Sequence, residues 1–397
     1  MGMNRLTRAV TKVARMIAIG TGATCAGYGA AAQAAEPAPL EIARQGYFFA
    51  GGSYYDTPDG RFMSGHMYVE FQIPKVQTQP YPVVMFSGGG QSGLNYMGTP
   101  DGREGWMQFF LRRGYAVYVL DQPSRGRSPH QAEVGAQTRL PVARVQQQFT
   151  APERSNLWPQ AKLHTQWPGT GVEGDPVFDQ FFAQNFPSLA SFPRQQELNR
   201  DAGAALLDKI GPAILLTHSQ SGTFGWLIAD ARPALVKAIV AMEPSGPPVR
   251  ENLTKGAPNW FEDGPLTKAY GLTAPPLAYD PPLAAPTDLK FVRQEHPDAP
   301  DLAMCWAQAE PARKLVNLMN IPVLVMQTEA SYHAPYDHCT VNYLRQAGVK
   351  PTFVRLADQG IKGNGHMMML EKNNMEIAEV AAKWLGETFK AKGKAAP

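Results

Sequence analysis

Short apolar stretches alternate with helical stretches along most of this chain, and this alternation limits its fold more than any other feature. Extended stretches are expected at residues 46–50, 67–73, 83–87, 115–121, 213–217, 236–242, 322–327 and 352–357. Helices are expected at residues 102–113, 194–209, from 222, and at 338–347 and 373–390. Strands rich in Val, Ile and Leu that alternate with helices form a parallel sheet with helices on both faces. The sequence therefore predicts an α/β fold with a mostly parallel central sheet and an antiparallel lead-in.

Two longer segments interrupt this alternation, at about residues 130–192 and 246–310. Both are rich in proline and aromatic residues, and both follow the ends of expected strands. Open α/β sheets bind ligands at the carboxyl ends of their strands. We therefore expect the two insertions to form a cap over a site in a single domain that spans residues 36–397.

The first 35 residues are interpreted as a secretory signal peptide. Four basic residues precede a weakly apolar run from Met16 to Ala32, and this run leads into the A-x-A pattern Ala32-Gln33-Ala34. A periplasmic or secreted location follows from this interpretation. No later run of about 18 apolar residues exists in the sequence, so no membrane span is predicted.

Removal of the leader changes the net charge of the chain. The formal net charge is +3 and the leader carries four basic residues and no acid, so the mature chain has 3 − 4 = −1. A nucleic-acid partner is therefore not indicated.

Cys305 and Cys339 are the only cysteines beyond the leader, and we predict that they form a disulfide, with two buried free thiols as the alternative.

The strongest chemical signal is the run Leu-Leu-Thr-His-Ser-Gln-Ser-Gly at residues 215–222. It begins in an expected strand and ends where a helix is expected to start, which is the context of a nucleophile elbow. Thr217 and Ser221 occupy the two glycine positions of the usual G-x-S-x-G pattern. The context favours Ser219 as a nucleophile over a helix cap without chemistry.

Two segments could supply backbone donors to an oxyanion. The amide of Gln220 lies at the expected helix start, where N–H groups attract negative charge. The loop at residues 87–93 reads Ser-Gly-Gly-Gly-Gln-Ser-Gly, and the amides of Gly89 and Gly90 are the second candidates. This loop lacks the G-K-[ST] continuation of a phosphate-binding loop.

The expected order of such a triad along the chain is serine, acid, histidine. Of eight histidines, His366 lies after the last expected strand and before the last helix, between flanking glycines, and is the candidate base. Glu243 and Glu329 both follow strand ends and could each orient the imidazole. Position alone modestly favours Glu329.

Residues 121–128, Asp-Gln-Pro-Ser-Arg-Gly-Arg-Ser, resemble the D-x-x-G-x-G-x-S turn of the α/β-hydrolase superfamily. Together with residues 98–103 and 105–106, residues 218–222, and residues 363–369 with 373–374, they resemble the bacterial serine esterases typified by esterase 713. This resemblance implies an α/β-hydrolase fold and a carboxylic ester hydrolase with a Ser–His–Glu triad, and it selects Glu243 over Glu329. The type member carries adjacent cysteines in the loop where this chain has Gly89-Gly90.

No cofactor and no catalytic metal are predicted, because the sequence has neither an H-E-x-x-H motif nor a C-x-x-C pair. The expected partner is a small-molecule ester. Lactone or amide hydrolysis and perhydrolysis on the same scaffold are the alternative chemistries, and a non-catalytic binding protein is the alternative class. The oligomeric state, including a homodimer, stays open.

Overall fold

The computed structural model describes residues 38–393 of the 397-residue chain. Residues 40–397 form one compact unit, and a second unit spans residues 1–39, of which only Ala38 and Pro39 are described. The predicted signal peptide at residues 1–35 lies outside the described residues. None of the helices between residues 38 and 393 has the length and apolarity that crossing a bilayer requires.

An eight-stranded sheet in the order β1-β2-β4-β3-β7-β8-β15-β16 forms the centre of this unit. Its strands are β1 (Ile42–Thr57), β2 (Gly60–Pro74), β3 (Val83–Phe86), β4 (Val117–Asp121), β7 (Ala213–His218), β8 (Val236–Met242), β15 (Val323–Gln327) and β16 (Thr352–Arg355). The strands from β4 to β16 are parallel, whereas β1 and β2 form an antiparallel hairpin that also pairs antiparallel with β4. The predicted parallel sheet with an antiparallel lead-in is confirmed.

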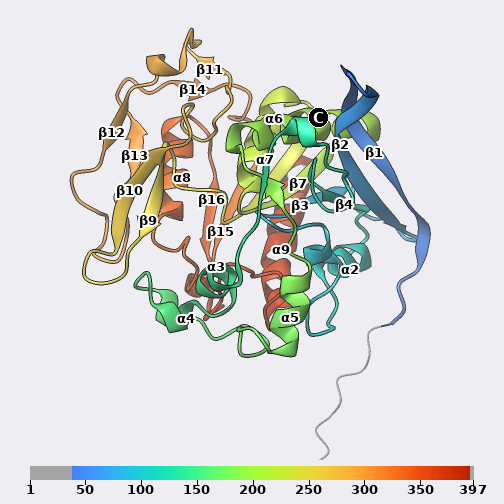
Figure 1. The fold of residues 1–397 in the computed structure, drawn as a ribbon, viewed down its shortest axis with the longest axis horizontal. Helices are drawn as coiled ribbons and strands as arrows, with labels where there is room; N and C mark the ends of the chain where they lie inside the picture. The colour runs from blue at the N-terminus through green and yellow to red at the C-terminus, as the bar shows by residue number, and fades with distance from the viewer. Residues whose placement is uncertain (1–37, 394–397) are drawn as a thin grey trace, which may run out of the picture. The chain divides into compact units, whose positions relative to one another are not determined.

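Helices cover both faces of the sheet because its central strands are apolar on both sides. All residues of β3, β7 and β15 are buried. One face packs against α6 (Phe192–Ile210), α7 (Ser221–Ala231) and α8 (Asp337–Gln346), and the other against α2 (Trp106–Arg112) and α9 (Asn374–Gly393). Figure 1 shows the β1–β2 hairpin at one edge of the sheet and α8 near the opposite edge. A short helix, α1 (Leu94–Met97), follows the glycine-rich loop after β3.

The predicted boundaries of one helix and two strands were wrong. The helix expected from residue 102 begins at Trp106, because Gly102 has a φ of 84° and a Cβ on Gly105 would lie 2.3 Å from the Tyr96 carbonyl oxygen. The first two strands are 16 and 15 residues long, far longer than the stretches predicted at residues 46–50 and 67–73. Gly51 and Gly52 lie within β1 and are both at positive φ. They interrupt the apolar pattern of the sequence, although the strand itself continues through them.

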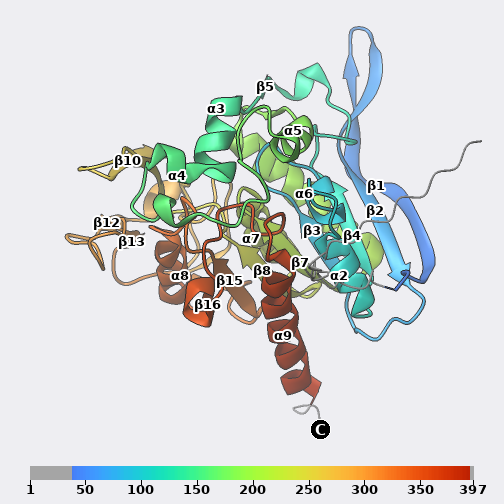
Figure 2. The same ribbon diagram turned by 90° about the horizontal axis from the view of Figure 1, so that it is seen from below.

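The first insertion consists mainly of short helices, and the second consists mainly of two-stranded hairpins. The first contains α3 (Val142–Val145), α4 (Pro152–Ser155) and α5 (Pro176–Ala183), with β5 (Gln137–Thr138) paired to β6 (Ser188–Leu189). The second contains β9 (Arg250–Thr254) with β10 (Phe261–Leu266), β12 (Phe291–Arg293) with β13 (Trp306–Gln308), and β11 (Tyr279–Asp280), which pairs with β14 (Lys314–Leu315) beyond it. Single 3-10 or π turns occur at Ala132–Val134, Gln146–Thr150, Ala161–Leu163, Pro286–Asp288 and Leu356–Gln359. Figure 2 shows α3, α4 and α5 together, with α9 extending away from them.

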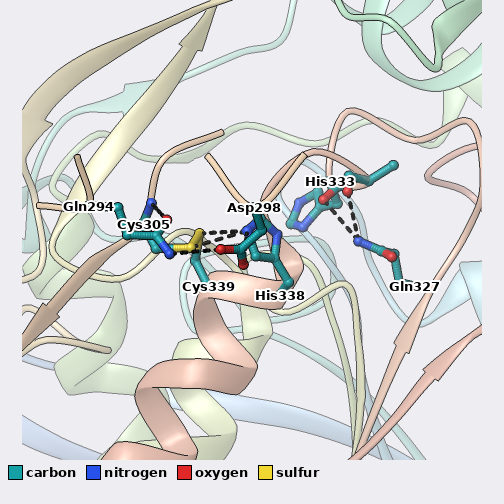
Figure 3. Close-up of a disulfide and its surroundings, with 8 residues drawn as sticks. Gln294, Asp298, Cys305, Gln327, His333, His338 and Cys339 are labelled. Carbon is teal, nitrogen blue, oxygen red and sulfur yellow. Dashed lines mark hydrogen bonds and ion pairs between the residues drawn. A yellow bond between two sulfur atoms is a disulfide. The ribbon is translucent and has the colours of Figure 1, made fainter. Parts of the chain in front are cut away.

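A disulfide joins Cys305, near the end of the second insertion, to Cys339 in α8. The predicted pairing is therefore confirmed. Figure 3 shows the imidazole of His338 beside the two sulfur atoms, with Nε2 3.2 Å from Cys305 Sγ and 3.7 Å from Asp298 Oδ2. The bridge fixes the second insertion to the helix that follows β15.

Candidate active site

Ser219 occupies the sharp turn between β7 and α7. Its φ of 55° lies in the left-handed region, which costs a non-glycine residue about 1–3 kcal/mol. Neighbouring backbone groups hold this conformation: Ser219 N–H donates to Met242 O at 3.0 Å, and Ser219 O accepts from Gly222 and Ser245 N–H at 2.8 Å each. The hydroxyl of Ser219 is thereby held above the carboxyl end of the sheet, on a side chain that is nearly buried.

The two non-glycine residues of the elbow are accommodated by their surroundings. The Ser221 hydroxyl accepts from His218 N–H at 2.8 Å and lies 2.9 Å from the Phe86 carbonyl oxygen, so it ties the turn to β3. Thr217 packs where a Cβ added to Gly225 of α7 would lie 3.0 Å from its methyl group. Because Gly225 has no side chain, it leaves room for Thr217 at a position where the usual pattern has glycine.

Gly222 provides the remaining close approach between the elbow and the next strand end. A Cβ at this position would lie 2.5 Å from Pro244 Cβ and 2.6 Å from Pro244 Cα. Contacts this short do not occur without movement of the backbone. Gly222 therefore brings α7 against the segment that follows β8, where Glu243 lies.

Glu243 is fully buried directly after β8, and its carboxylate accepts four hydrogen bonds. Oε1 accepts from Thr328 N–H at 2.9 Å and from the Thr328 hydroxyl at 2.5 Å. Oε2 accepts from the Ser331 hydroxyl and from His366 Nδ1, both at 2.6 Å. The backbone of Glu243 has a φ of 43°, so the second residue of this site is also held in a strained conformation.

Burial governs the titration of this carboxylate–imidazole pair. Desolvation raises the pKa of Glu243 above its usual value, and neighbouring His333 and the hydrogen bonds from Ser331 and Thr328 oppose this rise. Desolvation also lowers the pKa of His366 well below its usual value, and neighbouring His333 adds to this effect. The His366 imidazole is therefore neutral at neutral pH and able to accept a proton at Nε2, while Glu243 fixes the Nδ1 side.

Aromatic side chains enclose the His366 ring. His333 stacks on it with centroids 4.8 Å apart and an interplanar angle of 12°, and Phe149 of the first insertion stacks at 5.4 Å. The Tyr332 hydroxyl lies 3.3 Å from His366 Nε2 and also forms a side-chain hydrogen bond with Ser219. One hydroxyl group therefore contacts both Ser219 and His366.

The loop that carries His366 is braced by the first insertion. Glu371 accepts from Gly365 N–H at 2.8 Å and from the Asn364 side chain at 2.7 Å. His164 Nε2 lies 2.8 Å from Glu371 Oε1, and its Nδ1 lies 3.0 Å from Glu153 Oε2. Burial lowers the pKa of His164, but the hydrogen bonds to the two carboxylates outweigh it and raise the pKa to about 9.

Arg125 connects the glycine-rich loop to the elbow. Its guanidinium donates to Gly88 O at 2.8 Å and to Gln220 Oε1 at 3.0 Å. The Gly90 amide donates to Ser188 Oγ at 3.2 Å, so it already has an acceptor. Among residues 38–393, the amides of Gly89 and Gln220 have no hydrogen-bond acceptor. These two N–H groups are consequently free to bind a ligand oxygen.

The structure joins Glu243 directly to His366, links Ser219 to His366 through the Tyr332 hydroxyl, and separates Glu329 from them. Glu329 Oε2 accepts from Gly363 N–H at 2.8 Å, and no hydrogen bond joins it to His366 within the described part of the chain. Ser219 faces a cavity of about 690 Å³, within the range of small-molecule sites. The cavity is lined by residues of both insertions, including Arg139, Phe149, Asn252, Lys268, and by Tyr332 and His333.

Sequence reasoning did not identify the residues of the loop after β15 that complete this site. Thr328 and Ser331 bind the carboxylate of Glu243, and Tyr332 contacts Ser219 and His366. His333 pairs with Asp337 through Nδ1 at 2.8 Å. The one sequence signal that could have indicated these residues is the position of their loop, at the carboxyl end of a parallel strand.

Comparison with known proteins assigns this arrangement to a family. The model described as "Alpha/beta hydrolase family" matches residues 83–380, most of the chain, so the protein belongs to the alpha/beta hydrolase family. This membership confirms the predicted fold class and the resemblance to the superfamily.

Two similar proteins have names that are more specific than the family description. "Probable secreted lipase phiG" from Fungal sp. (strain ATCC 74256) is 48% identical over 341 residues, which cover 85% of this chain and 88% of that protein. The solved structure described as "The Atomic Resolution Structure of a Novel Bacterial Esterase" superposes with a TM-score of 0.56 at 25% identity, covering 89% of this chain and 98% of the other. The chain is thus similar along most of its length to a protein named a lipase and to an esterase.

Proposed function

We propose that this protein hydrolyses carboxylic esters with a Ser219–His366–Glu243 triad through a covalent acyl-enzyme. The observation that carries the proposal is the buried hydrogen bond of 2.6 Å between Glu243 and His366 Nδ1, with the Tyr332 hydroxyl in contact with both His366 Nε2 and Ser219. The names of the two relatives, a lipase and an esterase, support the same reaction.

In the first half of the reaction, His366 Nε2 accepts the proton of Ser219 as its oxygen attacks the ester carbonyl. Glu243 keeps the proton of the imidazole on Nδ1 and stabilises the imidazolium. The amides of Gly89 and Gln220 bind the oxyanion, since the Gly90 amide donates to Ser188. The imidazolium then gives its proton to the departing alcohol.

In the second half, water attacks the acyl group and His366 again accepts the proton. The stacking of Phe149 and His333 on the imidazole supports this proposal because it holds the ring in one orientation through both steps. We also propose that the insertions at about residues 130–192 and 246–310 form the cap over the site, since both contribute to the cavity wall. A secreted location agrees with the interpretation of residues 1–35 and with the name of the fungal relative.

The proposal is tested with a fluorophosphonate probe and a short 4-nitrophenyl ester. The wild-type protein should gain the mass of one phosphonyl group, and Ser219→Ala should abolish labelling and lower kcat by about 10⁴-fold or more. Ser245→Ala is the matched control, because this serine lines the same cavity and should stay labelled at position 219. Ester hydrolysis that persists in Ser219→Ala would contradict the proposal.

A further inference from the structure

We propose that the cavity in front of Ser219 contains an anion-binding subsite formed by Lys268 and Asn252, and that the substrate is an ester carrying a free carboxylate. This inference rests on the proposed ester hydrolysis and specifies its substrate class. Both residues belong to the second insertion: Asn252 lies in β9, and Lys268 follows β10. Both line the cavity that Ser219 faces.

Lys268 is buried in the cavity wall without a counter-charge. Its side chain is only 2% exposed, and its ammonium donates to Pro247 O at 2.9 Å and to Gly246 O at a longer 3.4 Å. No carboxylate lies within ion-pair distance of this ammonium in the part of the chain that the structure describes. An ammonium has three donors, and burying a charge without a partner is costly. A carboxylate bound in the cavity would supply both the missing acceptor and the missing charge.

Asn252 is an independent indication of a polar ligand at this wall. Both atoms of its amide, Oδ1 and Nδ2, are inaccessible to solvent and have no hydrogen-bond partner among the described residues. The hydroxyl of Thr267, next to Lys268 in the chain, is also inaccessible and unpartnered. Buried polar groups in folded proteins are almost always hydrogen-bonded. Both residues line the cavity, and a rotation of either side chain toward it would let the Asn252 amide N–H and the Thr267 hydroxyl donate to a carboxylate.

The charges that line the rest of the cavity are mainly positive. Arg139 and Arg144 of the first insertion form no ion pair with a carboxylate of the described residues, although Arg144 donates to Gln148. Glu251 is the negative side chain of this wall, and it acts on Lys268 only through its field. Lys255 also lines the cavity, but it is paired with Glu262 at 2.9 Å. With Lys268 included, three cations without an ion-pair partner among the described residues therefore face one carboxylate, which favours an anionic substrate over a cationic one.

Burial lowers the pKa of Lys268 to about 8, so the side chain is still mostly protonated at neutral pH. A structural role, in which Lys268 only ties down the carbonyl groups of Gly246 and Pro247, would not require a charge. The two roles differ in what they predict. The structural role makes hydrolysis indifferent to a carboxylate on the substrate, whereas the subsite makes it prefer one.

The test compares esters of equal shape that differ in charge. The monomethyl esters of succinate, glutarate and adipate are measured beside the same esters with the free carboxyl replaced by a carboxamide. The readout is kcat/KM for the acid ester divided by kcat/KM for the matching carboxamide ester. Three chain lengths are used so that the result does not depend on the spacing between Lys268 and Ser219. The wild-type enzyme should prefer the acid by about tenfold or more for at least one length.

Lys268→Met and Asn252→Leu should each lower this ratio, the first by roughly 10- to 100-fold, as expected for losing a charge-assisted hydrogen bond. Lys350→Met is the matched control: this lysine is exposed and does not line the cavity, so its loss should leave the ratio within about twofold. If Lys268→Met does not fold, the wild-type ratios and Asn252→Leu still decide the question.

A wild-type ratio of one or less at all three lengths would overturn the subsite, and so would a ratio that Lys268→Met and Asn252→Leu leave unchanged. The failure of the proposed function is distinguishable, because it appears as hydrolysis that survives Ser219→Ala, whatever the ratio. Ratios that fall in both subsite variants and hold in Lys350→Met would establish the subsite.

Discussion

Replacing Glu243 by glutamine tests the geometry of the triad most directly, because the carboxylate accepts four hydrogen bonds and an amide cannot. The side-chain oxygen of a glutamine can accept from Thr328, but its NH₂ group must then face His366 Nδ1, 2.6 Å from the position of Oε2. Two N–H groups cannot face each other at that distance. The imidazole is therefore forced into the tautomer with its proton on Nε2, which cannot accept a proton from Ser219.

The expected result for Glu243→Gln is a loss of about 10³- to 10⁴-fold in kcat with a small change in KM. The free energy of unfolding should fall by about 1–3 kcal/mol, since the Ser331 hydroxyl and Thr328 lose a charged acceptor. Steady-state kinetics on a 4-nitrophenyl ester and urea denaturation measure the two effects separately.

Glu329→Gln is the matched control for this substitution. Glu329 accepts one hydrogen bond, from Gly363 N–H, which an amide oxygen can still accept. Its kcat should stay within about threefold of wild type, in line with the small effect expected for a retained neutral bond. A folded Glu243→Gln enzyme with kcat within tenfold of wild type, or a larger loss in Glu329→Gln, would refute the assignment of the acid.

Three further predictions follow from other contacts. The pKa of His164 is raised to about 9, so its contribution of at most about 3 kcal/mol is complete below its unfolded pKa near 6.5 and disappears as the pH rises through 9. The stability gap between His164→Gln and wild type, measured by urea denaturation, should therefore narrow from pH 6 to pH 10, and a constant gap would contradict it. Gly222→Ala should lower kcat by about 10-fold or more and the unfolding free energy by about 1–3 kcal/mol, whereas Gly386→Ala, with open space around its added methyl group, should stabilise by about 0.5–1 kcal/mol. Replacing Cys305 and Cys339 by serine should lower the unfolding free energy by about 3–4 kcal/mol, judged from the 34-residue separation, and a melting temperature equal to wild type would exclude this.

Local sequence patterns predicted the parts of this protein that depend on neighbouring residues. The nucleophile candidate Ser219 could be identified because a strand, a tight turn and a helix follow one another within residues 213–231, and His366 could be identified from its order along the chain. The choice of Glu243 required the family resemblance. Position alone favoured Glu329, because sequence does not tell which of two strand ends faces the imidazole.

The rest of the site depends on contacts that have no local signature. Ser331 meets Glu243 across 88 positions of sequence, and His164 meets Glu371 across 207. The sequence around Tyr332 and Lys268 does not distinguish them from other loop residues, and only the fold places them in the cavity that Ser219 faces. Lys268 in particular could only be predicted as exposed, because lysine is rarely buried and nothing in its neighbours indicates the carbonyl groups that hold it.

The left-handed backbone at Ser219 and Glu243 has a consequence for attempts to improve this protein. Glycine adopts that conformation without strain, so selection for thermal tolerance alone would favour glycine at position 219 and would remove the hydroxyl. At position 243 the four hydrogen bonds of the carboxylate oppose the same exchange. Screens for higher stability should therefore also require turnover, because two of the strained residues of this fold are the ones we propose to do its chemistry.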